Sequence, residues 1–122
     1  MKELTKGEEQ IMQILWDMEK GFVHDVIDKM PEPKPAYNTV STIIRILVKK
    51  NFVAFKAYGK THEYYPIVAK DEYRSFFLNT MVSNYFGGSI EKVVSFFAKD
   101  KNLSVSDVEQ MMKTIENDLK DE

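Results

Sequence analysis

The side chains best suited to chemistry in this chain form a run of cations without carboxylates. Between positions 34 and 62 the sequence contains no Asp or Glu. Six basic residues lie in this run: Lys34, Arg45, Lys49, Lys50, Lys56 and Lys60. A local surplus of cations can neutralise the phosphates of a nucleic acid. We therefore favour a DNA-binding surface over a solvated face that merely lacks acids.

The charge of the chain is divided unevenly along the sequence. Residues 1–70 include 11 Lys/Arg and 9 Asp/Glu, whereas residues 71–122 include 6 and 10. The first part carries a net charge of +2 and the second −4, which together give the overall −2. The near-neutral total thus hides a polarised molecule whose cationic part is N-terminal.

Two helices are predicted before the basic run. Thr5 and Glu8 form a capping box, and apolar residues follow at helical spacing, which predicts a helix at about 5–18. Gly21 is expected to end it. A short helix is predicted at about 24–30, and three prolines between positions 31 and 35 break the chain after it.

The basic run itself is predicted to form a helix and a hairpin. The helix covers about 38–50, and Asn51 is expected to end it in place of glycine. Its expected inward residues are Val40, Ile43, Ile44, Leu47 and Val48. Two segments rich in aromatic and β-branched residues, 52–58 and 61–67, flank Gly59 and predict a β-hairpin. This order predicts a winged helix-turn-helix domain over residues 1–70.

The outward side of the 38–50 helix is predicted to enter the major groove of double-stranded DNA. Small hydroxyl and amide side chains in its first turn, with an arginine one turn later, suit contacts to base edges and phosphates. The predicted groove residues are Asn38, Thr39, Ser41, Thr42 and Arg45. The side chains predicted to contact the phosphate backbone are Lys49, Lys50, Lys56 and Lys60.

Residues 71–122 are predicted to form a helical dimerisation domain. Helices are expected at about 71–85 and 90–99. A last helix is expected to open with Ser104 or Ser106, and Ser106 with Glu109 is predicted to form its capping box. These short helices carry more apolar side chains than they can cover, which favours a homodimer over packing against the winged helix. The expected anchors are Phe76, Phe77, Met81, Phe97, Val108, Met112, Ile115 and Leu119. The predicted fold class is mainly α with a small β-hairpin.

An enzyme is not expected. The sequence contains no Cys and no Gly-rich phosphate loop, and its two histidines, His24 and His62, are far apart. No cofactor or metal is therefore predicted. The chain has no apolar run of the roughly 20 residues that span a membrane, so we expect a cytoplasmic protein without membrane insertion.

Four segments resemble the penicillinase-repressor family, the BlaI/MecI group. They are residues 4–16, residues 38–53, the segment Glu63-Tyr64-Tyr65-Pro66 and the segment Phe86-Gly87-Gly88-Ser89. The resemblance implies a homodimeric transcriptional repressor that binds a palindromic operator. It further implies control of β-lactam resistance or metallopeptidase genes.

The resemblance also implies a mode of release. In the family a membrane sensor metalloprotease acts as a partner, and the repressor is cut in its dimerisation region. The corresponding bond here joins Phe96 and Phe97, so the asparagine of the Asn-Phe bond of staphylococcal members is absent. The alternative function is a winged-helix module that binds another protein, against which the acid-free run argues.

Overall fold

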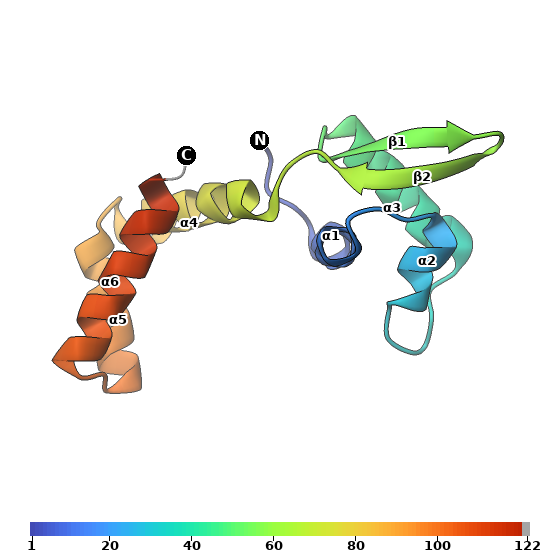
Figure 1. The fold of residues 1–122 in the computed structure, drawn as a ribbon. Helices are drawn as coiled ribbons and strands as arrows, with labels where there is room; N and C mark the ends of the chain where they lie inside the picture. Colours follow the sequence, from blue (N-terminus) through green and yellow to red (C-terminus); the bar gives the residue numbers. More distant parts are fainter. Residues whose placement is uncertain (121–122) are drawn as a thin grey trace. The chain divides into compact units, whose positions relative to one another are not determined.

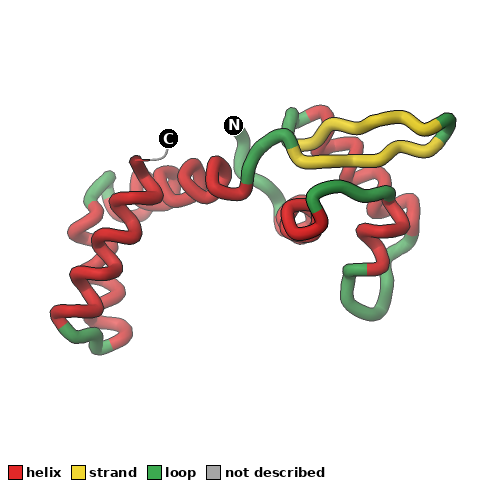
Figure 2. The backbone as a smooth tube through the Cα atoms, in the orientation of Figure 1, coloured by secondary structure: helices red, strands yellow, loops and turns green. Residues whose placement is uncertain are grey.

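A computed structural model describes residues 1–120, with side chains as far as Asp118. The described chain is mainly helical, with one antiparallel hairpin after the third helix, which confirms the predicted fold class (Figures 1 and 2). The elements are α1 (Lys6–Met18), α2 (Val23–Asp28), α3 (Tyr37–Lys49), β1 (Val53–Tyr58), β2 (Thr61–Pro66), α4 (Lys70–Phe86), α5 (Ile90–Lys101) and α6 (Val105–Lys120).

The chain divides into two compact units, Met1–Lys70 and a second one that begins at Asp71. In the first unit, α1 and α2 pack on α3, and the hairpin packs on α1 and α3. The core side chains of this unit are almost inaccessible because their apolar faces meet one another; they include Ile11, Leu15, Val26, Ile44, Leu47 and Phe52. This packing fixes α3 beside the hairpin.

Local sequence signals explain the start of α1 and the end of α3. Thr5 and Glu8 form the predicted capping box at the start of α1. Asn51 has a φ of 66°, which confirms that it takes the left-handed conformation after α3.

The prediction that Gly21 ends α1 is wrong. The helix stops at Met18, and Glu19 takes a positive φ. Gly21 instead pairs with the hairpin, since its N–H donates to the Tyr64 carbonyl at 2.9 Å and its carbonyl accepts from the Tyr64 N–H at 2.8 Å.

The second unit is a small helical assembly in which α5 and α6 lie side by side (Figure 1). The Ser75 hydroxyl donates to the Asp118 carbonyl, and Arg74 lies 3.5 Å from the Asp118 carboxylate, so α4 is tied to α6. The capping box predicted for Ser106 and Glu109 is wrong. Because α6 begins at Val105, Ser104 is the residue whose hydroxyl accepts from the Asp107 N–H, at 3.2 Å.

Candidate nucleic-acid interface

Helix α3 presents the predicted polar residues on its outward side. Asn38, Thr39, Thr42, Arg45 and Lys49 are exposed and Ser41 is half-buried. On the opposite side the predicted inward residues Val40, Ile44 and Leu47 are buried, while Ile43 and Val48 are half-buried. Helical spacing therefore predicted the two sides of α3 correctly, although it did not single out Ile46, which is also exposed.

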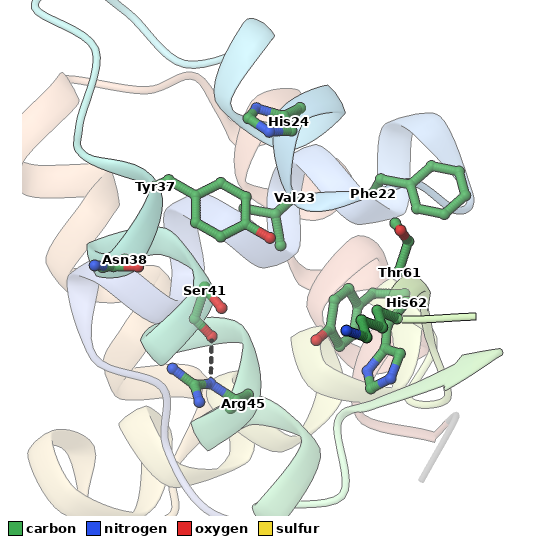
Figure 3. Close-up of a pocket in the computed structure, with 11 residues that line it drawn as sticks. Phe22, Val23, His24, Tyr37, Asn38, Ser41, Arg45, Thr61 and His62 are labelled. Carbon is green, nitrogen blue, oxygen red and sulfur yellow. Dashed lines mark hydrogen bonds between the residues drawn. The ribbon is translucent and has the colours of Figure 1, made fainter. Parts of the chain in front are cut away.

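A cavity of about 360 Å³ lies between α3, the start of α2 and the hairpin (Figure 3). Four predicted DNA-contact residues line it: Asn38, Ser41, Arg45 and Lys60. The remaining lining residues are Phe22, Val23, His24, Tyr37, Thr61, His62 and Tyr64. None of these eleven residues is acidic. The cavity is thus suited to an anion and lies where the helix and the wing meet.

The Arg45 guanidinium is held only loosely by its own helix. Its Nε donates to the Ser41 carbonyl and an Nη to the Thr42 hydroxyl, both at 3.4 Å. These distances are at the long end for hydrogen bonds, and neither acceptor is a carboxylate. The cation can therefore turn to an external acceptor at little cost.

The protonation of Tyr64 depends on its neighbours in the cavity. Burial raises the pKa of the Tyr64 phenol, Tyr37 raises it further, and the charge of Arg45 opposes the shift, so the net pKa is raised. The phenol is consequently neutral around pH 7. All three side chains line the same cavity.

Two ring pairs hold cavity residues in place. The Tyr37 ring lies 4.9 Å from that of His24, and the His62 ring stacks on Phe55 at 4.2 Å with an interplanar angle of 7°. Sequence reasoning did not assign these residues to the interface. Spacing contains the signal, because Tyr37 precedes Ser41 and Arg45 by one and two turns, and His62 and Tyr64 share a face of β2.

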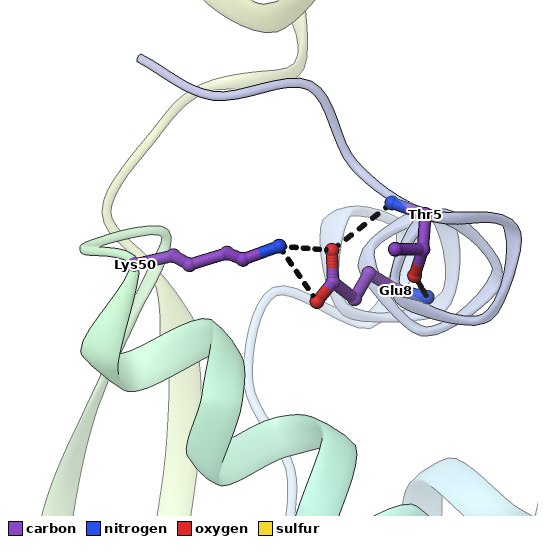
Figure 4. A network of polar contacts seen from close by, with 3 residues as sticks. All are labelled: Thr5, Glu8 and Lys50. Carbon is purple, nitrogen blue, oxygen red and sulfur yellow. Dashed lines mark hydrogen bonds and ion pairs between the residues drawn. The ribbon is translucent and has the colours of Figure 1, made fainter.

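Two lysines of the basic run make contacts within the fold. The Lys34 ammonium donates to the Asp28 and Met30 carbonyls at 3.0 and 2.5 Å, at the end of α2. The Lys50 ammonium contacts both Glu8 carboxylate oxygens at 2.8 and 2.9 Å, which ties the end of α3 to the start of α1 (Figure 4). Both cations thus stabilise the fold, and the contact of Lys50 with the phosphate backbone stays a prediction.

Two further lysines of the basic run, Lys56 and Lys60, belong to the hairpin, but they lie in different surroundings. Lys60, in the turn, lines the cavity. Lys56 is paired across the ladder with Glu63, on the face opposite His62 and Tyr64, and its ammonium lies 5.3 Å from the Tyr58 ring centre. Only Lys60 of these two lysines therefore faces the space beside α3.

Glu8 shows how strongly the Lys50 contact is made. Burial raises the pKa of the Glu8 carboxyl, but hydrogen bonds from Lys50 and the Thr5 N–H, with the Lys50 charge, outweigh burial and leave the pKa below its ordinary value. The carboxylate is thus ionised and fully engaged at neutral pH.

The predicted dimer anchors of the second unit are incompletely covered within one chain. Phe77 is exposed, whereas the side chain of Leu119 lies outside the described part. The other anchors are half-buried: Phe76, Met81, Phe97, Val108, Met112 and Ile115. Three further apolar residues of this unit are exposed but were not predicted as anchors. They are Tyr85, which is 80% exposed, Phe96, which is 55% exposed, and Val105. The rings of Phe86, Phe96 and Phe97 meet edge to face.

Residues 1–120 contain neither a cluster of metal ligands nor a membrane-spanning helix. No group of three or more potential His, Cys, Asp or Glu ligands comes together there to hold a metal ion. None of the helices in this range combines the length and apolar character needed to cross a bilayer.

Comparison with known proteins places the chain beside bacterial regulators. The sequence profile of a family described as penicillinase repressor matches residues 4–117. The methicillin resistance regulatory protein MecI of Staphylococcus aureus is 23% identical over 110 residues, which cover 89% of both chains, and that of Staphylococcus epidermidis matches equally well. A penicillinase repressor of Staphylococcus aureus is 22% identical over 118 residues, covering 96% of this chain and 93% of that protein.

Proposed function

This chain belongs to the penicillinase repressor family, whose members are DNA-binding transcriptional repressors and not enzymes, and we propose that it acts as a homodimer on a palindromic operator. The observation that carries the proposal is the outward side of α3, which is polar, basic and bordered by an acid-free cavity. A helix of this kind suits the major groove, and two copies related by symmetry suit two half-sites.

The proposed contacts divide along α3. Asn38, Thr39, Ser41 and Thr42 lie on the first turns, where they read base edges. Lys49, exposed in the last turn, contacts the phosphate backbone together with Lys60 of the hairpin turn. Base contacts give sequence preference, whereas phosphate contacts give affinity that falls with salt.

The direct test is selection of an operator from random duplex DNA, followed by gel-shift measurements. Thr42→Ala should weaken binding of the selected operator by about 1–3 kcal/mol, roughly 5–150-fold, and should relax the preference at one base pair. Lys92→Ala is the matched control, because Lys92 is exposed on α5 in the other unit. If no duplex is selected above background, a protein partner becomes the better explanation of the winged helix.

The homodimer is supported by the apolar side chains that the second unit leaves uncovered. Contiguous exposed apolar surface commonly marks an interface with another chain. Light scattering of the full chain should therefore give the mass of two copies at micromolar concentration. A version ending at Lys70 keeps Val68, whose carbonyl accepts from the Trp16 indole at 2.9 Å, and should be a monomer that binds DNA far more weakly.

The proposal includes release of the operator by proteolysis, with control of β-lactam resistance or metallopeptidase genes. The Phe96–Phe97 bond lies inside α5, so a membrane sensor metalloprotease requires local opening of that helix. Cutting would detach α6 from α4 and α5 and would lower the avidity of the dimer for two half-sites. Mass spectrometry of the protein from induced cells checks this step, and an intact chain with derepressed genes would contradict it.

A further inference from the structure

We propose that the cavity between α3 and the hairpin holds one backbone phosphate of the operator, bound simultaneously by Arg45 of α3 and Lys60 of the turn. Tyr37 and His62 complete this phosphate site with a hydroxyl and an imidazole. The inference rests on the proposed function, and it changes the role of Arg45 from reading a base to fixing the backbone. It also makes the helix and the wing act on the same atom group of DNA.

The first reason is that both elements line one cavity. Arg45 comes from the third turn of α3 (Figure 3), and Lys60 comes from the β1–β2 turn. Both nevertheless border the same cavity of about 360 Å³. When α3 occupies a major groove, the strand that bounds the groove passes between the helix and the adjacent hairpin. A phosphate of that strand therefore enters the cavity, which has room for the group and for bridging water.

The second reason is chemical complementarity. The lining offers a guanidinium, an ammonium, hydroxyls and imidazoles, and it contains no carboxylate that would repel a phosphate. A guanidinium presents parallel N–H donors that match two phosphate oxygens, while an ammonium adds a point charge. A surface that contacts only water would not require so many hydrogen-bond donors around one cavity.

The third reason is that the donors of Arg45 are only weakly engaged within the chain. Its side chain borders the same cavity as Tyr64, a buried residue of β2. The weak 3.4 Å contacts to Ser41 and Thr42 leave its donors available for the phosphate.

The fourth reason is that the supporting side chains are already positioned. Tyr37 packs against His24, and His62 stacks on Phe55, so both rings have restricted freedom before DNA arrives. Preorganised donors lose less entropy on binding than mobile ones. Tyr37 and His62 are thus positioned to contribute, although neither lies among the residues that the charge pattern selects.

A methylphosphonate scan of the selected operator tests the inference. Each phosphate of a half-site is replaced in turn by an uncharged methylphosphonate, and affinity is measured for wild type, Arg45→Ala, Lys60→Ala and the double variant. Methylphosphonate at one position should weaken operator binding by the wild type more than at any other position. Both single variants should lose their sensitivity to methylphosphonate at that same position. With the phosphate neutralised, the two substitutions should no longer weaken binding. Lys92→Ala should retain the wild-type scan, and circular dichroism checks that every variant is folded.

Several outcomes would overturn the phosphate site while leaving the proposed function intact. Arg45→Ala and Lys60→Ala lose sensitivity at different phosphates if the helix and wing act separately. Arg45→Ala changes base preference without changing the scan if Arg45 reads a base. Free phosphate has the same chemistry; if it is the true occupant, inorganic phosphate at constant ionic strength releases the operator and no scan position depends on both cations. Failure to bind any duplex, by contrast, contradicts the proposed function itself.

Discussion

Replacement of Lys50 by methionine should destabilise the DNA-binding unit, because it leaves the Glu8 carboxylate buried without its cation. The Glu8 side chain is 6% exposed and that of Lys50 25% exposed, and the ammonium reaches both carboxylate oxygens. In Lys50→Met the carboxylate keeps the hydrogen bond from the Thr5 N–H at 3.0 Å. Breaking a buried pair costs about 3–5 kcal/mol, and the remaining donor and partial exposure reduce the cost here to about 1–3 kcal/mol.

Urea unfolding followed by Trp16 fluorescence measures this loss. Trp16 is the single tryptophan of the chain and belongs to the DNA-binding unit, so it reports that unit alone. A loss of about 2 kcal/mol with an m-value of about 1–2 kcal/mol/M lowers the urea midpoint by about 1–2 M. Lys49→Met is the control, because Lys49 is exposed beside Lys50 on the same turn and its loss should change stability by less than about 0.5 kcal/mol.

The pH dependence gives the experiment a second, independent readout. The pKa of Glu8 is lower in the folded chain than its ordinary value, so its stabilisation is present above the unfolded pKa of about 4.3 and is lost as pH falls through the folded pKa. The difference in free energy of unfolding between wild type and Lys50→Met should therefore be largest at pH 7 and much smaller at pH 3. Equal midpoints for Lys50→Met and Lys49→Met at pH 7 would refute the reasoning, and the double variant Glu8→Gln/Lys50→Met should recover part of the loss.

Three further predictions concern single sites. Asn51 has a φ of 66°, so Asn51→Val should cost about 1–2 kcal/mol in Trp16-monitored unfolding, whereas Asn51→Gly should be tolerated; equal costs would contradict this conformational reasoning. Ser104→Ala should remove about 0.5–2 kcal/mol through loss of the α6 cap, while Ser106→Ala should leave the thermal transition followed by circular dichroism unchanged. Phe77→Glu should convert the proposed dimer into a monomer in light scattering, and a mass of two chains for this variant would exclude Phe77 from the interface.

Local patterns predicted the elements well because their causes lie close together in sequence. The capping box at Thr5, the left-handed Asn51 and the alternation around Gly59 each depend on residues only a few positions apart. The error at Ser106 has the same origin, since two serines two positions apart offered equally plausible caps. The start of α6 at Val105 selects Ser104.

The roles of individual cations were less predictable because they depend on distant partners. Lys50 meets Glu8, which is 42 positions earlier, whereas the charge pattern assigned Lys50 to the phosphate backbone of DNA. The ring pairs of the cavity likewise join α2 to α3 and β1 to β2. Periodicity can place Tyr37 and Arg45 on one side of a helix, but only packing brings the hairpin over them.

The arrangement along α3 separates stability from DNA contact within one helix. At its C-terminal end Lys50 fixes the helix to α1 through Glu8, and Asn51 allows the chain to turn into the hairpin. At its N-terminal end Ala36 provides no side-chain cap, and the polar residues up to Arg45 face outward or into the cavity. Substitutions near Lys50 should therefore change unfolding before affinity, whereas substitutions of the exposed polar residues between Asn38 and Arg45 should change affinity in a fold of unchanged stability. A rigidly anchored end is what allows the opposite end to be presented to DNA without a preceding rearrangement, since the helix axis is already fixed relative to the wing.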